Sequence, residues 1–267
     1  MVAAVFASAL ALAAPAVDRF DEGRAMQDLR MQVALGPRPA GSAASRELAR
    51  RIAARVPHAH FQPVFGGLRN VIGRIPGRDP RRTVILGAHY DTKNVRGFVG
   101  ANDAASGVAV LLEVARAIRP KTVRPNIVLL FFDGEEKPSD DGDFLTEGVR
   151  GSRAAVRLFR RRWPVVVVDM VGDRSLAIPR EANSDPALWS RIRSAALRVG
   201  AGSAFPAQTG TVVLDDHTPF QRAGFPAVDI IDFTFPCWHL TCDDLGAVAP
   251  RSLNQVGETL VSFLRAS

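Results

Sequence analysis

The sequence predicts a three-layer α/β/α fold with a central mixed, mostly parallel β-sheet. Apolar, β-branched runs alternate along the 267 residues with stretches of helical periodicity, a pattern typical of a sheet covered by helices. The run at 126–133 is nearly free of polar residues, as expected of a strand that is buried on both faces. Hydrophobic residues make up 47% of the chain, which is enough for a sizeable core.

The N-terminal part predicts two helices followed by two strands. Residues 18–35 have apolar side chains at roughly helical spacing and end at a Gly-Pro stop signal. Ser42 is a typical N-cap and predicts a second helix that ends at about residue 55. Strands follow at 70–75 and 83–90, and the PGRDPRR segment between them predicts a hairpin-like turn.

The remainder of the chain continues the alternation. The segment 103–118 places its apolar residues on one helical face. The polar, acidic segment 137–148 predicts a solvated loop that borders the site. The other expected strands are 126–133, 165–171 and 227–231, and the other expected helices are 151–161, 186–199 and 250–264.

The first residues, MVAAVFASALALAAPAV, are apolar and rich in alanine. The run is too short to span a bilayer, and it is similar to the apolar region of a signal peptide. We therefore expect a signal peptide at 1–17, a single catalytic domain at 18–267, and export without stable membrane insertion after signal removal. The alternative is that the run forms a buried helix.

The formal net charge of +7 comes mostly from scattered arginines. No aromatic interleaving and no nucleic-acid motif accompanies these arginines, so we expect no nucleic-acid partner. The two cysteines, Cys237 and Cys242, flank His239. In an exported protein they would form a short disulfide, and the alternative is two free thiols.

Polar residues follow the predicted strands where each one ends. In open α/β sheets, ligands bind just beyond the carboxyl ends of the strands. His89 and Asp91 alternate on a strand, so Asp91 is placed to orient a metal-bound His89. No polar residue interrupts the middle of these strands, which separates the pattern from a chance arrangement. Imidazole and carboxylate groups together are typical of a catalytic zinc site, and the further candidates are Asp103, Glu135, Glu136, Asp169 and His239.

Several segments carry a specific resemblance. GAHYD, GANDAASG, DGEE, DMVGD, DDHTPF and WHLTCDD resemble the motif series of the bacterial zinc aminopeptidases and their relatives, the glutaminyl cyclases. The resemblance extends from about residue 36 to the C-terminus. It implies the zinc aminopeptidase-like (phosphorylase/hydrolase-like) fold, in which helices cover both faces of a central mixed sheet.

The two branches of this family imply different metal sites. The aminopeptidase pattern implies two zinc ions (Zn2+), with Asp103 bridging them, Glu135 as general base, and ligands at His89, Asp103, Glu136, Asp169 and His239. The cyclase pattern implies one zinc ion, held by Asp103, Glu136 and His239. Glu135 is then a proton shuttle, Asp169 and Asp215 belong to a hydrogen-bonded network beside it, and His89 binds no metal.

Two features favour the cyclase branch. Asp215 adds a carboxylate before the Asp-His pair, and the FPCWH segment is similar to the cyclase loop that places Phe235 and Trp238 in the substrate pocket. The chain departs from the vertebrate cyclases at Asp229, where they carry a histidine, and it lacks their tryptophan after Glu136. Its FPCWH loop is also one residue shorter.

These patterns together predict a function. We expect a zinc-dependent glutaminyl-peptide cyclotransferase that converts N-terminal Gln of peptides and proteins to pyroglutamate with release of ammonia, and that acts as a monomer. The first alternative is a two-zinc aminopeptidase that hydrolyses N-terminal residues from peptides. The second is a non-catalytic binding domain of the same fold.

Overall fold

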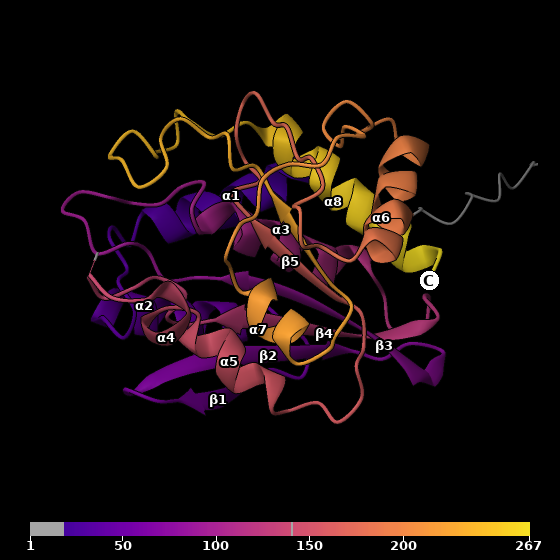
Figure 1. The fold of residues 1–267 in the computed structure, drawn as a ribbon, viewed down its shortest axis with the longest axis horizontal. Helices are drawn as coiled ribbons and strands as arrows, with labels where there is room; N and C mark the ends of the chain where they lie inside the picture. Colours follow the sequence, from indigo (N-terminus) through magenta and orange to yellow (C-terminus); the bar gives the residue numbers. More distant parts are fainter. Residues whose placement is uncertain (1–18, 140) are drawn as a thin grey trace, which may run out of the picture.

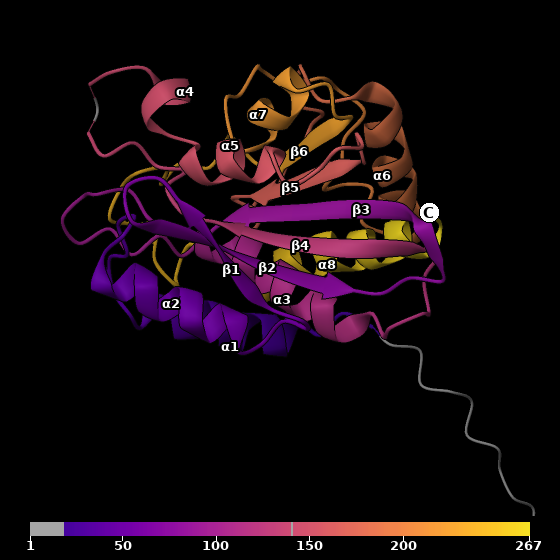
Figure 2. The same ribbon diagram turned by 90° about the horizontal axis from the view of Figure 1, so that it is seen from below.

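The computed structural model describes residues 19–139 and 141–267, so the predicted signal peptide lies outside the described residues. A six-stranded sheet in the order β1-β2-β4-β3-β5-β6 forms its centre, and helices cover both faces (Figures 1 and 2). The predicted three-layer fold is therefore confirmed. The strands are β1 (His60–Val64), β2 (Leu68–Ile75), β3 (Asp79–His89), β4 (Pro125–Phe132), β5 (Val165–Asp169) and β6 (Ala227–Ile231).

The sheet is mixed and mostly parallel, as predicted. Strand β3 pairs in parallel with β4 and β5, and β5 pairs in parallel with β6. Strand β2 pairs antiparallel with β1 and with β4. Strand β1 was not predicted as a separate strand, because it is a five-residue edge strand that contains a proline, Pro63.

The predicted hairpin between β2 and β3 is wrong, because β4 lies between these two strands. Instead, Arg78 in the connecting segment and Asp79 at the start of β3 donate backbone hydrogen bonds to the carbonyl oxygens of Val123 and Arg124, just before β4, at 3.0 and 2.9 Å. The apolar run of β4 is buried on both faces, and a central position gives it a neighbouring strand on each edge. The residues of the turn between β2 and β3 do not determine which strand pairs with which, so they do not predict the central position of β4.

The helices form two layers. Figure 2 shows α1, α2, α3 and α8 on one side of the sheet and α4, α5 and α7 on the other. The Ser42 side chain accepts a hydrogen bond from the Ser45 N–H at 3.0 Å and caps α2, as predicted. The helices are α1 (Glu22–Val33), α2 (Ala43–Ala53), α3 (Ala105–Ala117), α4 (Phe144–Glu147), α5 (Arg150–Val156), α6 (Pro186–Arg198), α7 (His217–Arg222) and α8 (Pro250–Arg265).

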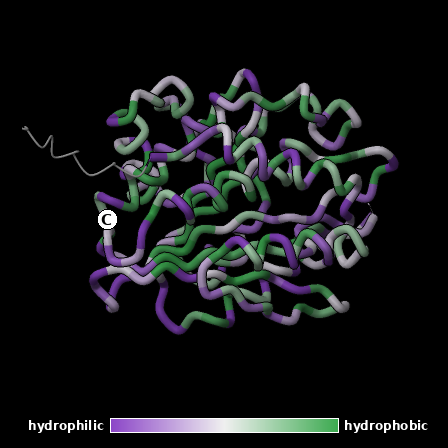
Figure 3. The backbone as a smooth tube through the Cα atoms, turned by 180° about the vertical axis from the view of Figure 1, so that it is seen from behind, coloured by the Kyte–Doolittle hydropathy of each residue, from purple (hydrophilic) through white to green (hydrophobic). Residues whose placement is uncertain are grey.

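Each face of the sheet has its own apolar core. The larger core joins the sheet to α1, α3, α6 and α8, with Leu111 and Leu260 among its fully buried members. The smaller core joins it to α5 and α7 through Phe220. Figure 3 shows the hydrophobic stretches gathered in the interior of the molecule. Within the described part of the chain, we find no helix with the length and apolar character needed to cross a membrane.

A close contact between α3 and β5 brings polar groups together at the carboxyl edge of the sheet. A Cβ atom at Gly107 would lie 2.1 Å from the carbonyl oxygen of Val168, so only glycine permits this approach. Asp103 precedes α3 and Asp169 ends β5. Because Gly107 has no side chain, α3 can approach β5 closely enough for these two carboxylates to lie in one site.

We expect the Gly107→Ala variant to be less stable than the wild type by about 1–3 kcal/mol, because the added methyl group forces α3 away from β5. The shift would also separate Asp103 from Asp169 and weaken metal binding. Urea unfolding of the metal-free protein measures the stability, and a separate zinc titration of the folded protein measures metal binding. Unchanged stability would show that the contact is less tight than the geometry indicates.

Candidate metal centre

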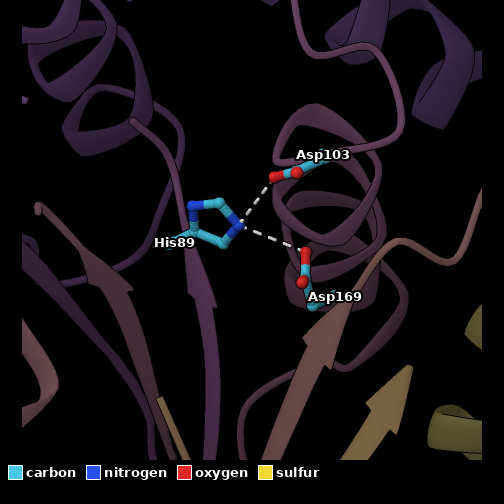
Figure 4. A group of neighbouring side chains, drawn as sticks. All are labelled: His89, Asp103 and Asp169. Atoms are coloured by element: carbon cyan, nitrogen blue, oxygen red, sulfur yellow. Dashed lines mark hydrogen bonds and ion pairs between the residues drawn. The ribbon is translucent and has the colours of Figure 1, made fainter. Parts of the chain in front are cut away.

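His89 lies between two carboxylates at the edge of the sheet (Figure 4). It is the last residue of β3. The parallel pairing of β3 with β5 runs to Gly87 and Val167, so His89 and Asp169, each two residues further on, lie at the same edge of the sheet. The His89 Nε2 atom is 3.2 Å from Asp169 Oδ1 and 3.3 Å from Asp103 Oδ1. Among the described residues, these three side chains form one group whose ligand atoms lie within 4.8 Å of one another.

A second group shares Asp103 with the first. The His239 Nε2 atom is 3.2 Å from Glu136 Oε1 and 3.5 Å from Asp103 Oδ2. The ligand atoms of Asp103, Glu136 and His239 also lie within 4.8 Å of one another. The two oxygens of Asp103 thus face two different imidazoles, and the structure brings together all five residues that the sequence indicated as ligands.

Asp91 organises the turn that carries the two glutamates. Its carboxylate accepts backbone hydrogen bonds from Gly134, Glu135 and Glu136, at 2.8, 3.1 and 3.2 Å. The Asp91 Oδ1 atom is 3.8 Å from His89 Nδ1, which is longer than a hydrogen bond. Asp91 therefore lies beside His89, as predicted, but its direct contacts fix the backbone at Glu135 and Glu136.

Burial and the repulsion of neighbouring carboxylates raise the pKa values of Glu135 and Asp169. Burial raises the pKa of the Glu135 carboxyl well above its usual value, Glu136 and Asp215 add to the rise, and His89 opposes it. Burial also raises the pKa of Asp169 to about 7, against the effect of His89. Burial lowers the pKa of His89, but the charge of Asp169 and contacts with Asp103 outweigh it and raise this pKa well above its usual value.

The donor set fits a zinc ion. Glu136 Oε1 is buried, and His239 Nε2 lies 3.2 Å from it. Burying such a carboxylate oxygen is costly unless a proton or a metal satisfies it. Two carboxylates and one imidazole match the three protein ligands of a catalytic zinc site, which leaves a position open for substrate. The group of Asp103, Glu136 and His239 is one such set, and Asp103 is placed to bridge to a second.

A cavity of about 340 Å³ opens over this centre. Glu135, Asp169 and Asp215 line it together with Trp238, as expected of catalytic and pocket residues. Phe235 does not line the cavity, which corrects the prediction. It is buried behind the wall, where it packs in a small apolar cluster that also contains Met170, Val213 and Ile231.

Several wall residues were missed by the sequence analysis. Phe233 lines the cavity in place of Phe235, and its ring centroid is 4.9 Å from that of Trp238. Lys93 also lines it, with Nζ 3.7 Å from Glu136 Oε2. Lys93 lies two residues after Asp91, and continuing the alternation from His89 through Asp91 would have identified it. The remaining missed wall residues include Lys137, Phe144, Val212 and Leu214.

Asp215 belongs to a buried acidic cluster behind the cavity. Its ligand atoms lie within 4.8 Å of those of His217 and Asp229. Neither oxygen of Asp215 has a hydrogen-bond donor among the described residues, and the network of Asp169 and Asp215 stays a prediction. Asp229 lies in the middle of β6, facing His217 Nδ1 at 3.4 Å. The statement that no polar residue interrupts a strand is therefore wrong for β6.

Comparisons with known proteins show a family match and related proteins. The chain matches Peptidase family M28 over residues 70–264. It is 28% identical over 230 residues to glutaminyl-peptide cyclotransferase of Drosophila melanogaster, covering 72% of this chain and 62% of that protein. The chain thus spans less than two thirds of the length of this curated relative.

Two solved structures have the same fold. One is a leucine aminopeptidase precursor from Bacteroides thetaiotaomicron VPI-5482, with a TM-score of 0.84, 27% identity, and coverage of 94% of this chain and 99% of that one. The other is a Bacteroides thetaiotaomicron glutaminyl cyclase bound to N-acetylhistamine, with a TM-score of 0.83, 26% identity, and coverage of 93% and 99%. Both branches of the predicted resemblance are therefore represented.

The raised acid pKa values predict an unusual pH dependence for the metal-free protein. Asp169 has a folded-state pKa of about 7, above its value in the unfolded chain, so its contribution to stability is present at low pH and is lost as pH rises through the folded pKa. His89, whose pKa is also raised, acts with the same sign. We therefore expect the melting temperature of chelator-treated protein to be higher at about pH 6 than at about pH 8.

Zinc-loaded protein is the control for this experiment, because a bound cation compensates the same carboxylates and should flatten the dependence. Differential scanning calorimetry at several pH values measures both forms. A melting temperature of the metal-free form that is lower at about pH 6 than at about pH 8 would contradict the raised pKa values of Asp169 and His89.

We expect the Asp91→Asn variant to bind zinc about 10–100-fold more weakly, because an amide provides one acceptor oxygen where three backbone N–H groups need two. Competition with a chromogenic chelator measures this affinity. Asp79→Asn, at the opposite end of β3, is the matched control and should bind as the wild type does. Equal affinities in the two variants would remove the role assigned to Asp91.

Proposed function

The chain belongs to Peptidase family M28, and on that basis we propose that it is a zinc-dependent glutaminyl-peptide cyclotransferase. It would convert N-terminal Gln of peptides and proteins to pyroglutamate with release of ammonia. The observation that carries this proposal is that Glu135, Asp169 and Asp215 line one cavity with Trp238. The likeness to the Drosophila melanogaster cyclotransferase and to the Bacteroides thetaiotaomicron cyclase supports it.

The substrate would lie with its side-chain amide at the metal centre. A zinc ion held by Asp103, Glu136 and His239 would supply Lewis-acid polarisation of that amide carbonyl. Phe233 and Trp238 provide an apolar wall, against which the methylene groups of the glutamine side chain pack as the chain folds back. Ring closure consumes no water.

Glu135 has the properties of a proton carrier. It is nearly fully buried, it lines the cavity, and burial keeps its pKa well above the usual value. In the proposed reaction its carboxylate takes a proton from the attacking α-amine and transfers it to the departing nitrogen, which leaves as ammonia. A raised pKa serves both halves of this transfer, since the same group must accept and then release a proton near neutral pH.

One observation favours a second candidate function. The group of His89, Asp103 and Asp169 is complete beside the first, as a two-zinc aminopeptidase requires. In that reaction Glu135 activates a water molecule, and an N-terminal residue is released. The likeness to the Bacteroides thetaiotaomicron leucine aminopeptidase precursor supports this candidate.

Export is part of the proposal. The Cys237–Cys242 disulfide supports it, because structural disulfides are typical of oxidising compartments. The expected monomeric state stays a prediction.

Mass spectrometry of a short peptide with N-terminal Gln tests the proposed reaction directly. After incubation with zinc-loaded protein, we expect loss of ammonia from an otherwise intact peptide. The Glu135→Gln variant should be slower by about 10²–10⁴-fold, because it lacks the proton carrier. Near-full turnover in this variant would contradict the role of Glu135 as proton carrier. Release of free glutamine by the wild type would establish the aminopeptidase instead.

A further inference from the structure

The segment that carries His239 is closed by a covalent bond. Cys237 and Cys242 form a disulfide with a Cα–Cα distance of 5.5 Å, so His239 lies inside a six-residue ring. Within the ring, the Leu240 N–H donates a hydrogen bond to the Cys237 carbonyl oxygen at 3.0 Å. We propose that this ring and Asp243, together called the His239 clamp, are positioning elements that hold His239 against Asp103 and Glu136 for metal binding.

Asp243 connects the ring to the turn that carries Asp103. Its carboxylate accepts backbone hydrogen bonds from Asn102 at 2.7 Å and from Asp103 at 3.0 Å. Its own N–H donates to the Leu240 carbonyl oxygen at 3.0 Å, and its carbonyl oxygen accepts from Ala101 at 3.2 Å. A single buried residue, directly after Cys242, thus fixes the ring relative to Asp103.

His239 depends on this support more than the other ligands do. Its side chain is 27% exposed, whereas that of Asp103 is 4% and that of Glu136 is 5% exposed. Packing in the core therefore fixes the carboxylates but leaves one side of the imidazole open to solvent. The rings of Trp238 and Phe98 contact the imidazole, with centroids at 4.4 and 6.2 Å, and the covalent ring restricts the backbone that carries it.

The backbone of His239 gives independent support. Its φ angle is +57°, a region that non-glycine residues adopt rarely and keep only when their surroundings impose it. The ring closure between Cys237 and Cys242 is such a constraint. When the disulfide is opened, the constraint is removed and extended conformations become accessible, which turn the imidazole away from Glu136.

The clamp is accessible to a reductant. Cys242 is exposed and Cys237 is partly buried. A water-soluble phosphine reduces the S–S bond to two thiols, with two electrons from phosphorus and two protons from water, and leaves as the phosphine oxide. Opening of the ring is therefore controllable in the intact protein, without a mutation.

The test compares zinc affinity in three forms: wild type, phosphine-reduced wild type with its thiols blocked by iodoacetamide, and the Cys237→Ser/Cys242→Ser variant. We expect both open forms to bind zinc about 10–100-fold more weakly than the closed form, which is the range for lost support of a metal ligand. Competition with a chromogenic chelator measures the affinity, and far-UV circular dichroism checks the fold. Reoxidation of reduced, unblocked wild type should restore tight binding, and phosphine should leave the serine variant unchanged.

Two results would overturn the proposal. One is equal zinc affinity in the closed and open forms. The other is weaker binding in the alkylated protein with wild-type binding in the serine variant, which would assign the effect to the alkyl groups. Because the readout is metal affinity, the outcome is independent of whether the protein closes a pyroglutamate ring or hydrolyses a peptide bond.

An Asp243→Asn variant separates the two parts of the clamp. Its ring stays closed, but its amide provides one acceptor oxygen for the N–H groups of Asn102 and Asp103. We expect zinc binding to be weakened, with the remaining affinity still sensitive to phosphine. Asp244→Asn, the neighbouring exposed residue, is the matched control and should leave the zinc affinity unchanged. Wild-type zinc affinity in Asp243→Asn would contradict the role assigned to Asp243.

Discussion

The arrangement of the site depends on one carboxylate, Asp103, whose two oxygens face the imidazoles of His89 and His239. Three separate parts of the fold hold it there. The start of α3 approaches β5 at Gly107, and Asp243 accepts hydrogen bonds from the backbone beside Asp103. The buried Arg38 side chain donates to the carbonyl oxygens at residues 99 and 100, just before the turn, at 2.8 and 3.2 Å.

The cost of burying charge explains why several parts of the fold fix Asp103. Buried carboxylates gather at one edge of the sheet, and the free energy of burying each one is high unless a counter-charge or a proton is present. Arg38 is one counter-charge: burial lowers its pKa to about 10, while Asp243 and Asp103 oppose the decrease. Lys93, with Nζ 3.7 Å from Glu136 Oε2, is another, and a bound metal cation would add to both. The same burial keeps the pKa of Glu135 raised, so the proposed metal binding and the proposed proton transfer would depend on one electrostatic condition.

The sequence predicts this edge well because local chemistry encodes it. The apolar runs of β4 and β5 identify buried strands, and their polar ends identify the site. The order of the strands in the sheet is not predictable in this way. The placement of β4 between β2 and β3 follows from burial of a whole strand, not from the turn that precedes β3. The sequence does not decide between a disulfide and two free thiols for the same reason, since disulfide formation depends on a Cα–Cα distance that two cysteine positions do not define.

The side chains that choose the reaction are harder to predict than those that bind metal. Ligands lie at strand ends or beside a helix start, where alternation and register place them. The cavity wall comes from an irregular loop, in which Phe233 faces the cavity and Phe235 faces the protein interior, and neither periodicity nor spacing distinguishes the two. A cyclase and an aminopeptidase can share every ligand here, because they differ in whether an amine or a water molecule attacks. The choice between the two reactions therefore lies with the groups that position the attacking amine or water, and the cavity wall that includes Phe233 and Trp238 is where such groups lie.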